Sequence, residues 1–278
     1  MKKREIAKTI RGQRAIDGAG VRLVRVLGGG DVYDFDPFLM LDSFDSTDSS
    51  DYIAGFPMHP HRGIETITYL IHGKIEHEDN LGNKGTIHAG ESQWMTAGSG
   101  ILHQEMPKPS DRMLGFQLWL NLPRTEKMTA PAYLSITADM IPQVKKEQAE
   151  IRVLSGHFDE ASGTRPRHVQ ATIYDITLFA GKTLELPTVP DETVFIFLID
   201  GNGTVSGQPI LSKTAVLFDK GDYIAVSAQP DADLRFIFFS AKALHEPIEW
   251  GGPIVMSTRE ELALAFEELR RGTFIKHD

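Results

Sequence analysis

The chain has 278 residues, of which 41% are hydrophobic and 24% are charged, a composition typical of a globular protein with a sizeable core. It contains no cysteine, which excludes disulfides, thiolate nucleophiles, iron–sulfur clusters and thiolate zinc sites. The net charge of -9 argues against a nonspecific DNA-binding surface. The sequence has no apolar run as long as a membrane span and no recognisable signal peptide. We therefore expect a cytoplasmic protein with neither a membrane nor direct nucleic acid as a partner.

The first 25 residues are basic, but residues 21–27 read as an apolar strand whose arginines are solvated, which argues against a nucleic-acid arm. Residues 31–51 contain seven aspartates around the apolar run 38–41. Their spacing fits no EF-hand calcium loop, so we predict a solvated loop there.

Alternating segments separated by glycine-rich or polar turns dominate the rest of the chain. The first series predicts strands at 66–72, 75–79, 85–88, 93–96 and 113–122. Regularity falls between residues 123 and 167, and a second series follows at 171–179, 183–186, 194–200, 204–206, 215–218, 223–227 and 234–240. This spacing predicts an all-β protein whose antiparallel strands close into a barrel, with a domain boundary near residue 130.

A candidate metal site lies in the first series. Side chains on an extended strand alternate between faces, so His59 and His61 project to one side, and His103 and Glu105 also project together. Two neighbouring strands would then offer three imidazoles and a carboxylate. Glu65 also has the right parity and stays open as the alternative carboxylate.

This set of nitrogen and oxygen donors suits iron(II), manganese, copper, nickel or zinc. Three imidazoles and one carboxylate leave two positions of an octahedron for a bidentate substrate, or for a substrate and dioxygen. Candidates for an apolar wall against a flat ring are Trp94, Met95, Phe116 and Trp119.

The second series resembles a degenerate copy of the first, since residues 197–201 align with 69–73 and residues 221–222 with 90–91. In this register the four candidate ligands fall opposite apolar or ring side chains, namely Pro187, Val189, Leu234 and Phe236. We therefore expect one metal ion per chain.

A helix is predicted near the end of the chain. The pattern Ser257-Thr258-Arg259-Glu260 is typical of a capping box, and Gly272 is a plausible stop. Between them one helix face carries Leu262, Ala265, Phe266 and Leu269.

Two segments resemble the paired motifs of cupin domains: residues 59–73, which begin His59-Pro60-His61, and residues 90–107, which contain His103-Gln104-Glu105. With further similarity at 36–39, 117–122 and 252–257, nearly the whole chain is similar to the pirin family of bicupins. The resemblance implies two facing antiparallel β-barrels of the jelly-roll type. Residues 1–130 would form a metal-binding cupin, 131–250 a degenerate cupin without metal, and 251–278 a helix that packs back on the first barrel.

The resemblance also implies a site and a function. Family ligands carry over onto His59, His61, His103 and Glu105, with iron as the metal and Glu65 as a nearby support. Pirin-like proteins divide between quercetin 2,3-dioxygenase activity and regulation through partner proteins. Our leading hypothesis is a metal-dependent dioxygenase that acts on a flavonol-like compound with dioxygen, in which Glu105 shifts from ligand to general base.

Two alternatives remain. The first is a non-enzymatic, iron-dependent redox sensor that docks on a transcription factor or a metabolic enzyme and reports the iron state through a surface near Arg62. The second is a metal-dependent sugar isomerase, but the sequence shows no sugar-phosphate clamp.

Overall fold

The structure is a computed structural model that describes residues 1–277. Its contacts divide these residues into two compact units. The N-terminal unit comprises residues 14–32 and 38–138 together with the chain from Leu244 onward. The C-terminal unit comprises residues 1–13, 33–37 and 139–243.

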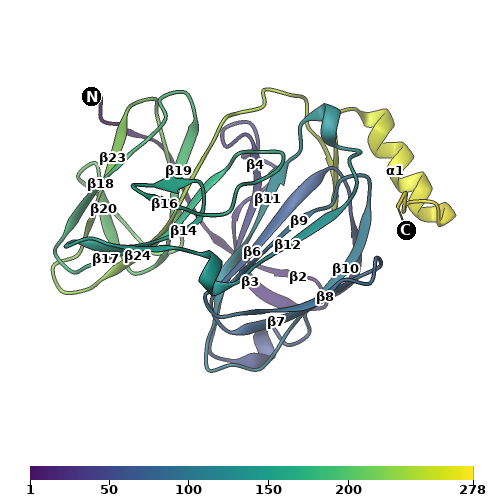
Figure 1. Ribbon diagram of the computed structural model, residues 1–278, viewed down its shortest axis with the longest axis horizontal. Coiled ribbons are helices and arrows are strands. Elements are labelled where there is room, and N and C mark those ends of the chain that lie inside the picture. The colour runs from purple at the N-terminus through teal and green to yellow at the C-terminus, as the bar shows by residue number, and fades with distance from the viewer. Residues whose placement is uncertain (278) are drawn as a thin grey trace. The chain divides into compact units, whose positions relative to one another are not determined.

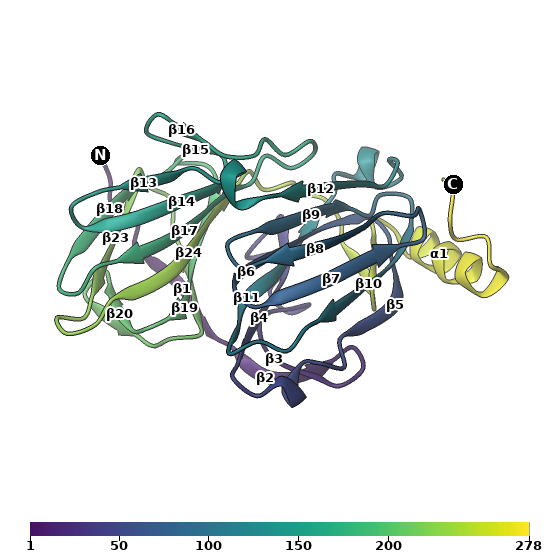
Figure 2. The ribbon, with the colours of Figure 1, turned by 60° about the horizontal axis from the view of Figure 1, so that its bottom comes forward.

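The N-terminal unit contains two antiparallel sheets. The larger one consists, in spatial order, of β12 (Ala132–Ile136), β9 (Ser92–Thr96), β6 (Ile64–His72), β11 (Met113–Asn121), β4 (Phe38–Ser46), β3 (Val21–Leu27) and β2 (Gln13–Asp17). The smaller one consists of β5 (Phe56–His61), β10 (Ile101–Pro107), β7 (Lys74–Asp79) and β8 (Lys84–His88) (Figure 2). Side chains of the two sheets meet in the interior, where Trp119 of β11 contacts His61 of β5.

The C-terminal unit repeats this topology strand for strand. Its larger sheet consists of β1 (Ile6–Arg11), β22 (Thr214–Phe218), β19 (Thr193–Asp200), β24 (Leu234–Ala241), β17 (Thr172–Leu178), β14 (Ala149–Ser155) and β13 (Gln143–Lys145). The smaller sheet consists of β18 (Thr183–Pro187), β23 (Tyr223–Ala228), β20 (Gly203–Val205) and β21 (Gln208–Ile210). The expected all-β fold with two cupin domains is thus confirmed, although the sheets form open jelly rolls and do not close into continuous barrels.

The remaining elements are short. They are the hairpins β15 (His157–Phe158) with β16 (Ala161–Ser162) and β25 (Glu249–Gly251) with β26 (Ile254–Met256), and the 3-10 turns η1 (Ser49–Asp51), η2 (Arg124–Glu126) and η3 (Ala138–Met140).

The matching topology corrects the predicted alignment between the two series. The strand that corresponds to β10 is β23, so Leu234 and Phe236 of β24 are not the counterparts of His103 and Glu105. The error arose because the two aligned glycine–acid turns precede strands that do not correspond: residues 90–91 lead into β9, and residues 221–222 into β23. The inward positions of β23 are apolar and buried, namely Ile224, Val226 and Ala228.

The prediction of a loop at residues 31–51 is wrong for its central part, because β4 pairs there with both β3 and β11. Phe38, Leu39 and Leu41 are fully buried. The aspartates suggested solvent, yet Asp42 is buried against Arg25, which offsets its charge.

The first strand belongs to the C-terminal unit, because β1 pairs with β22. In the other direction β12, which follows the predicted boundary at residue 130, pairs with β9 in the N-terminal unit. Strand pairing therefore divides the chain at other places than residues 130 and 250. Those two predicted domain limits stay a prediction.

The C-terminal segment forms α1 (Arg259–Arg271; Figure 1). This helix packs on β26. The helix is capped by Thr258, whose hydroxyl accepts from the backbone N–H of Glu261. The capping box therefore begins one residue later than predicted. Ala265 is buried and Gly272 ends the helix in the left-handed conformation, with φ of 70°. Within residues 1–277, no helix has the length and apolar character needed to cross a membrane.

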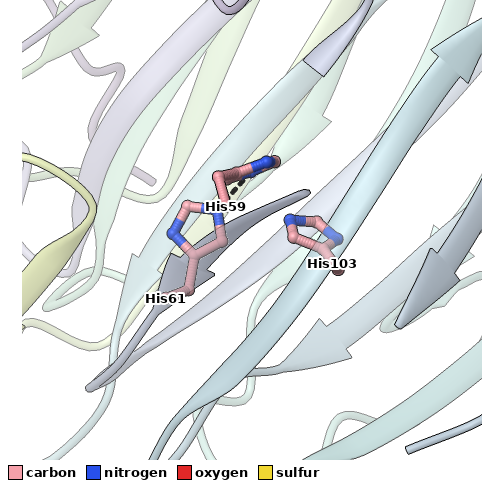
Figure 3. A group of neighbouring side chains, drawn as sticks. All are labelled: His59, His61 and His103. Carbon is pink, nitrogen blue, oxygen red and sulfur yellow. Dashed lines mark hydrogen bonds between the residues drawn. The ribbon is translucent and has the colours of Figure 1, made fainter. Parts of the chain in front are cut away.

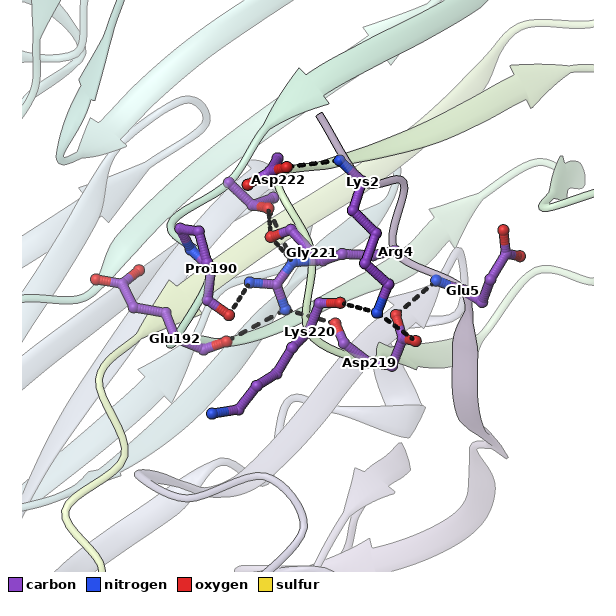
Figure 4. Close-up of polar contacts among 10 residues, drawn as sticks. Lys2, Arg4, Glu5, Pro190, Glu192, Asp219, Lys220, Gly221 and Asp222 are labelled. Carbon is purple, nitrogen blue, oxygen red and sulfur yellow. Dashed lines mark hydrogen bonds and ion pairs between the residues drawn. The ribbon is translucent and has the colours of Figure 1, made fainter.

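The basic N-terminal segment is anchored through Arg4, which is only 1% exposed (Figure 4). Its guanidinium donates to the backbone oxygens of Val189 (2.6 Å) and Asp219 (2.7 Å) and to the hydroxyl of Thr188 (2.8 Å). It also donates to three further backbone oxygens, those of Gly221, Pro190 and Glu192. One buried cation thus joins the start of the chain to two loops of the C-terminal unit.

We predict that Arg4→Met lowers the free energy of unfolding of the C-terminal unit by about 3 kcal/mol, because several buried oxygens lose their donor. Native-state hydrogen exchange of the amides of β18 and β23 measures this loss. Arg11→Met is the matched control, because Arg11 is exposed on the same segment. Equal protection in both variants would contradict the anchoring role of Arg4.

Candidate metal centre

Three of the four predicted ligands converge in the N-terminal unit. His59 and His61 lie on β5, and His103 lies opposite His59 on the neighbouring strand β10 (Figure 3). One ring nitrogen from each histidine lies within 4.8 Å of those from the other two. Among residues 1–277, no other histidine or acidic side chains form such a group.

Hydrogen bonds fix which ring nitrogen faces the centre. The Nδ1–H of His59 donates to the backbone oxygen of Pro57 (2.9 Å), and that of His61 donates to the backbone oxygen of Pro253 (3.1 Å). The Nδ1 of His103 lies 3.3 Å from the hydroxyl of Tyr133. Each Nδ1 thus has a hydrogen-bond partner. The three Nε2 atoms are left as the candidate ligand atoms.

The distance between the His59 and His61 rings is compatible with a cation bound by both. Their Nε2 atoms lie 3.0 Å apart, and neither carries a hydrogen when both Nδ1 atoms donate to carbonyls. Burial and the neighbouring His59 lower the pKa of His61 to about 3, so this ring is neutral at pH 7. Two facing lone pairs repel each other, whereas adjacent ligands about 2.1 Å from one ion would be about 3 Å apart.

His103 supports the same conclusion. Its Nε2 is buried and has no hydrogen-bond partner among the described residues. Burial, and then the nearby His61, lower the pKa of His103 well below its usual value. A buried polar atom without a partner is costly, and a metal ion would satisfy it. The three imidazoles therefore fit a divalent transition metal.

Glu105 lies on the same strand, two residues beyond His103, but a β-bulge between them changes the pairing with β5. Its carboxylate accepts from the hydroxyl of Thr68 (2.9 Å) and from the side-chain amide of Gln117 (2.6 Å). It does not belong to the group of atoms within 4.8 Å. A carboxylate has about four acceptor positions, so these two bonds leave room for a metal. Ligation by Glu105 stays a prediction.

The alternative carboxylate, Glu65, faces away from this centre. Thr66 and Thr68 of β6 point into the interior, so the intervening odd-numbered positions point outward. Glu65 accepts from Thr96 (2.8 Å) on that side. The turn at Gly63, with φ of 78°, explains the difference: it separates β5 from β6, so the parity of His61 does not extend to Glu65.

A row of polar side chains crosses the larger sheet beneath the histidines. Cross-strand pairing aligns one inward residue from each of five neighbouring strands: Arg25, Asp42, Gln117, Thr68 and Gln93. The amide of Gln117 donates to both Thr68 (3.2 Å) and Glu105. The row thereby holds the carboxylate of Glu105 from the opposite sheet. Sequence reasoning missed it because the partners come from strands far apart in the chain.

A cavity of about 600 Å³ opens beside His59 and His61. Its aromatic lining comes from Phe56, Trp119 and Trp250. The ring of Trp119 lies 5.0 Å from that of His61 and 5.8 Å from that of Trp250.

Of the four predicted wall residues, Trp119 alone lines this cavity, while Met95 packs beside it in the core. Trp94 and Phe116 point to the opposite face of the sheet, since the residues adjacent to them in sequence face inward. The prediction of Trp94 and Phe116 as wall residues is therefore wrong. Trp250 was missed because it lies in the C-terminal segment, outside the strand series.

Arg62, which was expected near a reporting surface, is only 2% exposed. Its guanidinium donates to Glu268 of α1 (2.7 Å) and to the backbone oxygens of Ser99 and Phe274 (both 2.7 Å). The residue that follows His61 is thus tied to the C-terminal segment inside the protein.

We predict that Tyr133→Phe lowers the affinity for a divalent metal about tenfold, because the Nδ1 of His103 loses the hydroxyl partner that orients its ring. Competition with a chelator measures the change. Tyr33→Phe is the control, since that side chain is exposed in the other unit. An unchanged affinity in Tyr133→Phe would show that the 3.3 Å contact has no orienting role.

Two jelly-roll units, of which one carries a cluster of two buried histidines and one half-buried histidine between its sheets, define a bicupin with a candidate metal centre. The Pirin family model matches residues 20–120, and the model of the pirin C-terminal cupin domain matches residues 173–275. The chain therefore belongs to the pirin family.

Several relatives are similar to this protein over nearly the whole chain. A pirin-like protein of Caulobacter vibrioides is 42% identical over 98% of this chain and 99% of its own length. A Pseudomonas aeruginosa protein whose name proposes quercetin 2,3-dioxygenase activity is 40% identical over 97% of each chain. The crystal structure of a quercetin 2,3-dioxygenase from Acinetobacter baumannii superposes with a TM-score of 0.89 at 29% identity, over 98% of this chain and 99% of the other.

Proposed function

We propose that this protein is a metal-dependent dioxygenase of the quercetin 2,3-dioxygenase type, acting on a flavonol-like compound. The observation that carries the proposal is the cluster of three Nε2 atoms at the wall of an aromatic cavity. The names of two relatives and of one superposable structure support the same reaction class.

The cavity has the chemistry that a flat phenolic substrate needs. The indole rings of Trp119 and Trp250 offer apolar faces, and the neighbouring histidines provide the metal side. When bound, the metal would act as a Lewis acid toward the adjacent hydroxyl and carbonyl oxygens of a flavonol and would supply redox chemistry toward dioxygen. The aromatic faces would cover one side of a bound flat ring and shield it from water.

Glu105 is our candidate for holding the proton of the substrate hydroxyl. The residue is only 3% exposed, and its carboxylate accepts hydrogen bonds from Thr68 and Gln117. Two fixed donors keep the carboxylate in place whether it binds a metal or accepts a proton. We propose both roles, with His59, His61 and His103 as the remaining ligands.

Iron(II) is the metal that we propose, and manganese, copper, nickel and zinc suit the same donors. A bacterial pirin from Escherichia coli has been crystallised in complex with nickel(II), and its structure shares the fold at 24% identity with a TM-score of 0.64. Because the same donors suit several metals, the metal that is available during expression helps to decide which one is bound.

The proposal is tested by anaerobic purification, elemental analysis, and oxygen uptake after addition of quercetin. We expect about one metal ion per wild-type chain, and oxygen uptake that depends on quercetin. His61→Ala should lose both the metal and the uptake, because one buried ligand is removed. His88→Ala is the matched control, since His88 is exposed on β8. Metal binding without consumption of oxygen or quercetin would contradict flavonol dioxygenation.

A second candidate function is regulation through a protein partner that reads the state of the metal. The observation that favours it is the chain of contacts from His61 through Arg62 to Glu268 and Phe274. The ring of Phe274 also lies 4.1 Å from the guanidinium carbon of Arg62. A shift of β5 would thereby reach the C-terminal segment directly.

This second function predicts that hydrogen exchange in residues 259–277 differs between the iron(II) and iron(III) forms. Arg62→Lys should reduce the difference, because lysine cannot bridge three acceptors in this fixed geometry. Identical exchange in the two oxidation states would remove the support for a state-dependent surface.

A further inference from the structure

Arg25 is held at the wall of the cavity beside the metal centre. It lies on β3 directly opposite Asp42 of β4. Its Nε and Nη2 donate to the two carboxylate oxygens of Asp42 (2.9 and 2.7 Å), and Nη2 also donates to Asp17 (2.6 Å). The sequence suggested a solvated arginine, but this side chain is pinned by two carboxylates.

The pinned guanidinium still has donors to offer. Both bonds to Asp42 and the bond to Asp17 use Nε and Nη2, and among residues 1–277 no acceptor is found for Nη1. The side chain is 36% exposed and lines the same cavity as His59 and Trp119. Because the guanidinium is planar, fixing one edge on Asp42 also fixes the direction of Nη1.

The charges around Arg25 select the kind of ligand group. Asp17, Asp42 and Arg25 are the Asp, Glu, Lys or Arg residues that line this cavity, and their formal charges sum to -1. The hydrogen bond to Asp42 raises the pKa of Arg25, so the guanidinium stays charged. An anionic group would gain one donor but would be repelled by two carboxylates, whereas a neutral oxygen gains the donor without this cost.

We propose that Arg25 is a specificity-determining residue whose Nη1 binds a neutral oxygen of the substrate, a phenolic hydroxyl or a carbonyl, that is not held at the histidines. The proposal rests on the proposed function and deepens it: the preferred substrate is an uncharged aromatic compound with one oxygen pair for the metal and a further oxygen for Arg25. Asp17 and Asp42 are positioning residues in this arrangement.

The test compares two ligands that differ in their remote oxygens. Quercetin and 3-hydroxyflavone share the adjacent hydroxyl and carbonyl, but only quercetin carries further hydroxyls. Both are titrated anaerobically into the zinc-loaded protein, and Kd is read from quenching of tryptophan fluorescence, since Trp119 and Trp250 line the cavity. Binding is thereby measured without turnover.

In Arg25→Lys we expect Kd for quercetin to rise about tenfold, and Kd for 3-hydroxyflavone to change less than twofold, because one hydrogen bond from a charged donor is lost for quercetin alone. The pair Arg25→Gln with Asp42→Asn should give the same pattern and avoids leaving Asp42 buried and unpaired. Arg22→Lys is the matched control, because Arg22 is exposed on the same strand.

The outcomes separate this inference from the proposed function. Selective loss of quercetin affinity supports the role of Arg25 even where no oxygen is consumed. Equal loss for both flavonols, or no loss, overturns it even where oxygen uptake is confirmed. If wild-type protein binds neither flavonol, both proposals fail.

Discussion

Every polar side chain buried between the two sheets of the N-terminal unit needs a hydrogen-bond partner or a metal ion. The candidate metal site of this unit depends on that constraint. The row from Arg25 to Gln93 meets this requirement across five strands. Gln117 occupies its centre and contacts both sheets through Thr68 and Glu105. The hydrogen bonds that make this interior stable also orient the carboxylate next to the histidines.

The same constraint separates the two units. They share one strand topology, yet the smaller sheet of the C-terminal unit presents Ile224, Val226 and Ala228 to an apolar core. In the N-terminal unit the corresponding strand presents His103 and Glu105. The candidate metal site therefore differs from the apolar core in its side chains and not in its strand topology. It also needs polar residues on the opposite sheet, which form hydrogen bonds with Glu105.

What the sequence predicted, and what it did not, follows from the range of each interaction. The strand series and the projection of His59 with His61 depend on neighbours along the chain, and alternation predicts them well. Glu65 was considered because the alternation of faces was assumed to continue through Gly63. The chain in fact turns there into the other sheet, and a Cβ at this position would lie 2.0 Å from the backbone oxygen of Val255.

Long-range partners could not be predicted in this way. The ion pair between Arg25 and Asp42 depends on which strands pair, and Trp250 reaches the cavity from the end of the chain. The seven aspartates of residues 31–51 predicted a solvent-exposed loop, whereas Asp42 is buried. Such residues become recognisable only when the strand order is known.

The exchange of strands between the two halves of the sequence affects how the protein can be made. The strand β1 is synthesised well before its partner β22, which follows about 200 residues later, roughly 10 to 40 seconds at ordinary rates of translation. The N-terminal unit waits longer still, because Trp250 and Pro253, whose backbone oxygen accepts from His61, are synthesised after β22. A nascent chain therefore cannot orient the ring of His61 through this hydrogen bond, or complete the cavity beside it, until residue 253 has been made.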